Sequence, residues 1–240
     1  MGNRLQTQDR LIEAAREIII NEGMEATSLE HICKAAGFTR GAFYSNFSSK
    51  DSLLAALAEE EYTGLIERLR ATVERWSASG DESAPARADG DRDSEALLME
   101  NLLFEALDAI GVERDLFLLH SELILRSIRD PEWAERFSGI NEEFVDELGL
   151  VLVTILSAAG RELVSSRRAL THSVIGVVLR ASAIAGWRLS ASRRVGDDDR
   201  PRGSEEPASP APRAGAKSSA AREILEVVLT ILYASSRPRS

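Results

Sequence analysis

The stretch TSLEHICKAAGFTRGAFYSNFSSKD at residues 27–51 constrains the fold most, because it places two short helical patterns around a glycine turn. Its start fits the S/T-x-x-E capping pattern, which predicts a helix from Ser28 with Thr27 as the capping residue. Gly37 ends this helix, since glycine adopts the left-handed conformation at low cost. Thr39 caps a second short helix. Two short helices joined by a tight turn predict a helix-turn-helix.

The second helix of this pair divides its side chains between two faces, at about 100° per residue. Phe43 and Phe47 share one face and are predicted to anchor the helix in the core. Gly41 and Ser45 lie on the opposite face, with Tyr44 at its edge. A small polar face with donors at its rim suits a helix that lies in a nucleic-acid groove. The pattern also fits an ordinary helical hairpin, in which Tyr44 would simply cover apolar surface.

The net charge is distributed unevenly along the chain. Residues 1–50 hold six Lys/Arg and six Asp/Glu, so the whole net charge of −10 resides in the remainder. No acidic residue lies between Gly37 and Lys50. An acidic total argues against indiscriminate nucleic-acid binding, because phosphate contacts dominate such affinity. A local neutral-to-basic segment favours selective docking instead.

Several functional classes lack their usual sequence signals. The single cysteine, Cys33, cannot form an internal disulfide, and no Cys/His spacing indicates a zinc site. No Gly-rich phosphate loop, G-x-S-x-G or H-x-x-x-H motif occurs, so we expect neither an enzyme nor a bound cofactor or metal. The N-terminus lacks a signal-peptide core, and the apolar runs are too short to span a bilayer. We therefore expect a cytoplasmic protein without membrane contact.

Almost every periodic segment of the chain has helical spacing. We expect an all-α fold in which a long helix from Lys50 joins a three-helix N-terminal domain to a second helical domain. Asp130 followed by Pro131 predicts the start of another long helix. The remaining expected helices cover about 6–21, 94–109, 112–129, 166–190 and 221–235.

Two polar segments interrupt these helices. Residues 77–93 and 191–220 are rich in Pro, Ser, Ala, Gly and charged residues, which is typical of mobile or disordered segments. The expected domains are therefore a helix-turn-helix domain at 1–50 and a helical domain at 51–240 that contains the disordered loop 191–220. The last helix is apolar around most of its circumference, so its own domain and a second subunit are expected to cover it.

The segment TSLEHICKAAGFTRGAFYSNFSSKDSLL resembles the N-terminal DNA-binding signature of the tetracycline-repressor (TetR) family. The matching positions are Thr27, Ile32, Ala36, Gly37, Gly41, Phe43, Tyr44, Phe47 and Lys50. The resemblance covers about the first fifth of the chain, and beyond residue 60 it is architectural only. This chain has Asn46 where one common variant of the family has histidine, so that contact can differ in detail.

The resemblance implies a homodimeric, ligand-responsive transcription factor, in most cases a repressor that a small-molecule effector releases from a palindromic operator. Its partners would be double-stranded operator DNA, the effector and a second subunit. The family pattern places the dimer interface in the last two helices, which are expected here at about 166–190 and 221–235.

The resemblance also assigns the DNA contacts to two groups. The residues that would contact phosphates are Thr27, Thr39, Tyr44 and Lys50. The residues that would face the major groove are Arg40, Gly41 and Ser45. Helix N-termini and hydroxyl groups suit phosphate, and arginine can donate two hydrogen bonds to guanine. The expected contacts are completed by Ser28, Ala42 and Asn46.

The second domain offers aromatic and apolar candidates for an effector pocket, whose existence follows from the family resemblance alone. The candidates are Phe104, Phe117, His120, Leu123, Trp133, Phe137, Phe144 and His172. Each of them also fits plain core packing, and either histidine could be an ordinary buried or exposed side chain.

The alternative function is a helical ligand-binding or protein-interaction module without DNA binding. The acidic total favours this alternative, whereas the segment from Gly37 to Lys50 disfavours it.

Overall fold

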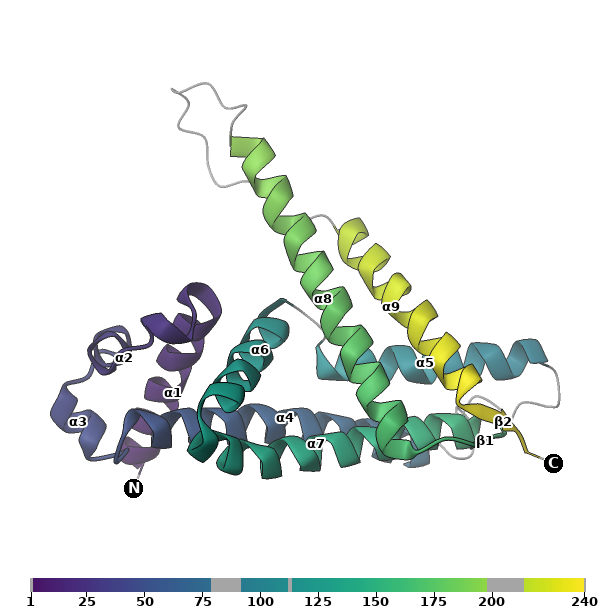
Figure 1. The fold of residues 1–240 in the computed structure, drawn as a ribbon, viewed down its shortest axis with the longest axis horizontal. Helices are drawn as coiled ribbons and strands as arrows, with labels where there is room; N and C mark the ends of the chain where they lie inside the picture. The colour runs from purple at the N-terminus through teal and green to yellow at the C-terminus, as the bar shows by residue number, and fades with distance from the viewer. Residues whose placement is uncertain (1, 79–91, 112–113, 198–213, 240) are drawn as a thin grey trace. The chain divides into compact units, whose positions relative to one another are not determined.

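The computed structural model describes residues 2–78, 92–111, 114–197 and 214–239 (Figure 1). These residues form the all-α fold that the sequence predicts, with one 3-10 turn and a small two-stranded sheet in addition. Within the described ranges, no helix combines the length and the apolar character needed to cross a membrane.

The elements follow the chain in this order. The N-terminal elements are α1 (Gly2–Glu22), the 3-10 turn η1 (Met24–Ala26), α2 (Leu29–Ala36) and α3 (Arg40–Tyr44). The central helices are α4 (Lys50–Ala78), α5 (Arg92–Ile110), α6 (Arg114–Arg129) and α7 (Pro131–Ala158). The C-terminal elements are β1 (Arg161–Leu163), α8 (Arg167–Asp197), α9 (Ala214–Ala234) and β2 (Ser236–Pro238).

Ser28, and not the predicted Thr27, caps α2. The Ser28 hydroxyl accepts a hydrogen bond from the backbone N–H of His31 at 3.2 Å. Thr27 is fully buried and donates its own hydroxyl to the carbonyl oxygen of Gly23 at 3.1 Å. The prediction missed by one residue because two hydroxyl side chains are adjacent, and the Thr27 hydroxyl bonds back across η1.

The turn between α2 and α3 forms as predicted. Gly37 has a φ of +73°, and the N–H of Phe38 donates to the carbonyl oxygen of Cys33 at 2.9 Å. Thr39 then caps α3 by accepting from the N–H of Ala42 at 3.2 Å. A left-handed glycine at one helix end and a threonine cap at the next therefore define the connection between the two helices.

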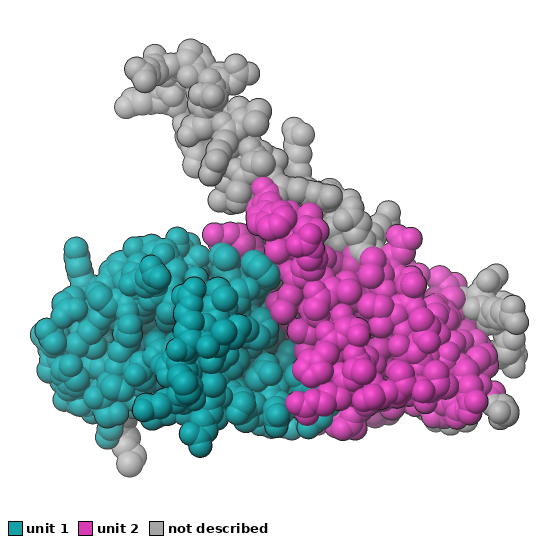
Figure 2. Space-filling model, viewed as in Figure 1, with its two compact units in different colours: residues 1–72, 115–148 teal, residues 73–114, 149–240 magenta. Residues whose placement is uncertain are grey.

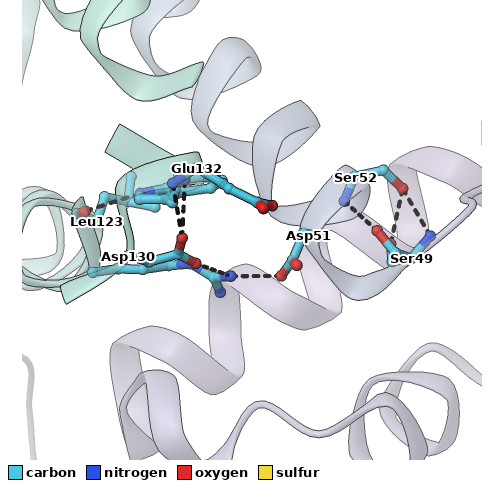
Figure 3. Close-up of polar contacts among 8 residues, drawn as sticks. Ser49, Asp51, Ser52, Leu123, Asp130 and Glu132 are labelled. Atoms are coloured by element: carbon cyan, nitrogen blue, oxygen red, sulfur yellow. Dashed lines mark hydrogen bonds and ion pairs between the residues drawn. The ribbon is translucent and has the colours of Figure 1, made fainter. Parts of the chain in front are cut away.

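Side-chain caps also begin the two long helices at the centre of the chain (Figure 3). Before α4, Ser49 and Ser52 each donate a backbone N–H to the other's hydroxyl, both at 3.1 Å. Before α7, Asp130 accepts from the N–H groups of Glu132 and Trp133, both at 3.1 Å. The start of α7 at the proline after Asp130 confirms the prediction from the Asp-Pro pair.

α8 and α9 are longer than the sequence predicts. Helical residues continue to Asp197 and resume at Ala214, because the flanks of the polar segment still contain good helix formers such as Ala, Arg and Lys. Residues 198–213, the middle of the predicted loop 191–220, lie outside the described residues. The same is true of 79–91 within the predicted loop 77–93.

The small antiparallel sheet near the C-terminus was not predicted. β1 pairs with β2, with Arg161 opposite Pro238 and Leu163 opposite Ser236. Arg161 is buried and donates to the hydroxyl and the carbonyl oxygen of Ser236 at 2.9 and 3.0 Å. Its guanidinium also lies 4.7 Å from the ring centre of Tyr233. These contacts tie the end of α9 to the segment that follows α7.

The chain divides into two compact units, which Figure 2 shows in different colours. Unit 1 contains residues 1–72 and 115–148, and unit 2 contains residues 73–114 and 149–240. α4 and α7 each continue from one unit into the other. This division by contacts differs from the predicted boundary at residue 50, because α6 and the start of α7 contact α4. The functional domains at 1–50 and 51–240 stay a prediction.

Each unit has its own apolar core. The most deeply buried side chains of unit 1 include Leu11, Ile19, Ile32, Phe43, Leu53, Leu57 and Leu123. Those of unit 2 include Met99, Leu103, Leu152, Ile155, Val228 and Leu232. In unit 1, α1 packs against α2, and in unit 2, α8 runs beside α9 (Figure 1).

Candidate nucleic-acid interface

The outer face of α3 consists of small and polar residues held in place by two buried rings. Phe43 and Phe47 are 0% and 8% exposed, as predicted, and their ring centres lie 5.8 Å apart. Tyr44 is 55% exposed and meets the Phe43 ring edge-on at 5.5 Å. Gly41 and Ser45 are exposed as well. α3 therefore presents to solvent a surface with little side-chain bulk.

No steric contact within the fold requires glycine at position 41. A Cβ at this position would meet only the Thr39 hydroxyl, at 3.7 Å, which is an ordinary van der Waals distance. Glycine inside a helix costs about 1 kcal/mol relative to alanine. The absent side chain leaves room on the solvent side of α3 for the close approach of another molecule.

Arg40, at the start of α3, is held by two neighbours. A hydrogen bond with Tyr44 and the nearby carboxylate of Glu30 raise the pKa of Arg40 above its usual range. The guanidinium lies 2.9 Å from the Glu30 carboxylate, which belongs to α2. The acid-free segment seen in the sequence thus receives an acidic partner from the preceding helix. Both side chains are more than half exposed, at 61% and 64%, so the pair can open readily.

The other residues expected to contact DNA occupy different surroundings. Thr27 is buried, so its hydroxyl does not reach the surface, whereas Ser28 is exposed beside it. Asn46 donates its side-chain N–H to the carbonyl oxygen of Ala42 at 2.8 Å. Among the described residues, its Oδ1 atom has no hydrogen-bond partner. Lys50 is half-buried at the first residue of α4.

Residues 11–57 match the model of a protein family described as bacterial regulatory proteins, tetR family. These residues are therefore a TetR-type DNA-binding region. The matched stretch runs from α1 into α4 and contains the whole helix-turn-helix. The exposed face of α3 is therefore part of a DNA-binding domain.

Curated relatives resemble the chain over about a quarter of its length. YvdT, an uncharacterised HTH-type transcriptional regulator of Bacillus subtilis, is 36% identical over 62 residues, which are 26% of this chain and 32% of YvdT. UidR, an HTH-type transcriptional regulator of Escherichia coli, is 32% identical over 68 residues, which are 28% of this chain and 35% of UidR. The similarity thus spans about a third of the length of these relatives.

Solved TetR-type structures share the fold along nearly the whole chain. A TetR-family transcriptional regulator from Mesorhizobium loti aligns over 97% of this chain and 98% of its own, with a TM-score of 0.59 and 15% identity. FadR from Bacillus subtilis, solved in complex with stearoyl-CoA, aligns over 92% and 97%, with a TM-score of 0.54 and 17% identity. The fold, including the C-terminal helices, is thus similar to that of these structures at an overall identity of 15–17%.

Asp51 at the start of α4 and Asp130 at the start of α7 (Figure 3) are both paired with Arg126 of α6. Its guanidinium pairs with Asp51 at 2.5 Å and with Asp130 at 3.4 Å. It also lies 5.0 Å from the ring centre of Trp133. Asp51 directly follows Lys50, an expected DNA contact. Within unit 1, Arg126 therefore links the first turn of α4, which follows the helix-turn-helix, to α6 and α7.

Tyr62 of α4 is the centre of an aromatic cluster in unit 1 that the sequence analysis missed. Its ring meets Phe137 and Phe144 nearly at right angles, each at 5.5 Å, and its hydroxyl is hydrogen-bonded to Nδ1 of His120. Burial raises the pKa of Tyr62 and lowers the pKa of His120 to about 4. His120 is therefore neutral near pH 7. Helical spacing could have revealed Tyr62, which lies seven residues before the buried Leu69 on one face of α4.

The structure gathers most of the expected pocket residues but not all of them. Those that are buried in unit 1 are His120, Leu123, Trp133, Phe137 and Phe144. Phe117 of α6 is half-buried. Phe104 on α5 is 52% exposed and His172 on α8 is also exposed, and both belong to unit 2. These two side chains point to solvent and are not part of the aromatic cluster.

Proposed function

We propose that this protein is a ligand-responsive repressor of the TetR type, which a small-molecule effector releases from a palindromic operator. The observation that carries the proposal is the small, exposed face of α3, fixed by the buried rings of Phe43 and Phe47. Such a helix can enter the major groove without steric hindrance. Gly41 supports the same role, because the fold itself leaves its position open.

In the proposed complex, Arg40, Gly41 and Ser45 face the bases. Thr39, Tyr44 and Lys50 contact phosphates, with Ser28, Ala42 and Asn46 beside them. Thr27 is left out of the interface, because its buried hydroxyl already bonds to the protein backbone. Arg40 must exchange Glu30 for DNA, which the exposure of both side chains permits.

The proposal assigns DNA binding to residues 1–50, and effector binding and dimerisation to residues 51–240. α8 and α9 pack along each other, yet they leave Trp187, Val227 and Tyr233 exposed at 62%, 46% and 39%. Large apolar side chains on neighbouring helices fit a two-fold interface with a second subunit. A dimer would present two copies of α3 to the two halves of a palindrome.

In this proposal the effector binds at the aromatic cluster around Tyr62, and Arg126 connects α6 with the first turn of α4. A ligand can shift the DNA-competent population only by binding one arrangement of the helices better than the other. The solved complex of FadR with stearoyl-CoA supports this part, since that protein has the same fold and holds a small molecule.

The proposal is tested by titrating the purified protein against fragments of the genome that encodes it, in gel-shift experiments at several salt concentrations. We expect one class of fragment to be preferred, with an affinity that falls as salt rises, because Lys and Arg contacts release counterions from DNA. A protein that shifts no fragment even at low salt would instead be a helical binding module without DNA binding.

A further inference from the structure

His120 of α6 has a buried ring nitrogen that the fold does not use. The side chain is 8% exposed, and its Nδ1 atom is occupied by the Tyr62 hydroxyl. Among the residues that the structure describes, the Nε2 atom has no hydrogen-bond partner. Buried polar groups without a partner are rare in proteins, so this atom requires an explanation.

The hydrogen-bond partners decide which proton His120 carries. If the phenol of Tyr62 donates to Nδ1, the ring proton lies on Nε2 and only that N–H is left unpaired. If Nδ1 donated instead, both the phenol proton and the Nε2 lone pair would be unpaired in the same buried cluster. The first arrangement leaves fewer unpaired groups. Nε2 is therefore a buried hydrogen-bond donor that has no acceptor among the described residues.

The surroundings of His120 restrict the chemistry of that acceptor. The ring of Tyr62 lies 5.9 Å from the His120 ring in a tilted arrangement, and Phe137 and Phe144 of α7 meet Tyr62 edge-on, so the histidine belongs to an aromatic cluster. The guanidinium of Arg126 lies over the ring of Trp133, which stacks on Phe137. It is paired with Asp51 and Asp130, although its Nε atom has no hydrogen-bond partner among the described residues. Two carboxylates already offset the one charge of this guanidinium, and burying a further charge among the rings is costly.

We propose that the Nε2–H of His120 is the polar anchor of the effector site, and that the effector is a neutral, mainly apolar molecule with a hydrogen-bond-accepting oxygen, such as an aryl ketone. The proposal rests on the effector response under Proposed function and specifies its ligand. The rings of Phe137 and Phe144 cover the apolar body of the molecule. Its oxygen accepts from His120, whose tautomer is fixed by Tyr62.

A matched pair of probes tests this assignment. Acetophenone carries a carbonyl oxygen, whereas α-methylstyrene has nearly the same shape with a CH₂ group in its place. Binding of each to the full-length protein is measured by calorimetry up to the solubility limit of the probe. We expect acetophenone to bind about tenfold more tightly, because only the ketone satisfies the buried N–H.

The variant His120→Phe keeps a ring at this position but removes the donor. The preference for acetophenone over α-methylstyrene should therefore disappear, while α-methylstyrene still binds. His172→Phe is the matched control, since that histidine is exposed on α8, and it should keep the full preference. The comparison of the two probes on the unmodified protein remains decisive even if His120→Phe does not fold.

Equal affinity for the two probes, binding of neither, or a preference that survives in His120→Phe would each overturn the assignment. These outcomes are separate from the fate of the proposed function. A protein that binds operator DNA but ignores acetophenone would refute only the ligand class. A protein that prefers acetophenone through His120 but binds no DNA would refute the repressor and leave the anchor in place.

Discussion

Arg40 lies at the first turn of α3, where the Glu30 carboxylate 2.9 Å away and a side-chain hydrogen bond with Tyr44 restrict its guanidinium. Two opposing contributions therefore determine how much Arg40 adds to the free energy of DNA binding. Bidentate hydrogen bonds to guanine favour the complex, and the loss of the pair with Glu30 opposes it. Since the ion pair is largely exposed, the contribution from DNA is expected to be the larger one.

Replacing Arg40 by alanine should cost about 1–3 kcal/mol of operator binding free energy, if the side chain reads a base. The loss should concentrate at one operator position, which a titration against operator variants would reveal. Arg75, near the end of α4 and outside the proposed interface, offers a control for the removal of one positive charge. A loss spread evenly over all DNA sequences would make Arg40 a phosphate contact instead.

Replacing Glu30 by glutamine should strengthen operator binding by about two- to fivefold, because Arg40 no longer has to leave an ion pair. The gain should disappear in the Arg40→Ala background, and fluorescence anisotropy of the four proteins of this double-mutant cycle measures it. Glu25→Gln is the control, since it removes the same charge from an exposed acid in η1, whereas Arg40 pairs with Glu30. An equal gain from Glu25→Gln would show that only the net charge matters.

The buried His120 makes the stability of the protein depend on pH. Its pKa is lowered from 6.5 to about 4 by burial, so the unfolded chain binds a proton that the folded chain does not. This contribution is fully present above about pH 6.5 and is lost as the pH falls towards 4, by about 3 kcal/mol in total. Urea unfolding at a series of pH values should show it.

The comparison for this pH effect is between two histidine variants. His120→Gln should flatten the fall in unfolding free energy between pH 6.5 and 4, while the exposed His172→Gln should leave it unchanged. Carboxyl groups that titrate in the same range, such as Glu60 with its raised pKa, are common to all three proteins and cancel in the difference. Identical profiles for wild type and His120→Gln would contradict the prediction.

At the scale of elements, α4 is the helix that joins the proposed functions. Its first turn is capped by Ser49 and Ser52 and paired through Asp51 with Arg126 (Figure 3). Further along, Tyr62 on the same helix contacts α6 and α7. A change in the packing of α6 or α7 within unit 1 would therefore act on the residue next to the expected DNA contact Lys50.

Replacing Arg126 by methionine should loosen the first turn of α4 while preserving the apolar contact with Trp133. The Arg126 side chain is 16% exposed and Asp51 is 53% exposed, so we expect a loss of about 1 kcal/mol in unfolding free energy. Hydrogen exchange of residues 50–54 should become faster. Arg129→Met, on an exposed position of the same helix, should leave both quantities unchanged. Unaltered exchange in Arg126→Met would exclude the proposed link.

At the scale of the whole molecule, the proposed dimer depends on apolar side chains of α8 and α9 that no described residue covers fully. Val227 is 46% exposed near the middle of α9, and Trp187 is 62% exposed on α8. A second subunit is the simplest cover for such a surface, and it would also provide the two-fold symmetry that a palindromic operator requires.

Replacing Val227 by glutamate should convert the proposed dimer into monomers, because it places a charge in the apolar interface that we propose. Operator affinity should fall at least about tenfold, since one α3 is lost from the complex. Val164→Glu is the control, because Val164 is similarly exposed, at 54%, but lies outside both helices. Analytical ultracentrifugation reports the outcome, and a variant that sediments as the unmodified dimer would rule out this interface.

The sequence by itself determined the features that depend on near neighbours. The glycine turn, the Thr39 cap, the Asp130 start of α7 and the burial of Phe43 and Phe47 all follow from residues within four positions of one another. Backbone sterics and capping hydrogen bonds act over that range, so the local pattern is sufficient to predict them. The same stretch carries the resemblance to the TetR family.

Only the tertiary structure decided which distant residues meet. Tyr62 and His120 are 58 positions apart, and Arg126 and Asp51 are 75 positions apart, as are Arg161 and Ser236. Such pairs depend on how α4, α6 and α7 pack, and periodicity shows only that each helix has a buried face. Local sequence therefore determines the proposed DNA-reading helix α3, whereas helix packing determines which buried polar groups of distant helices meet.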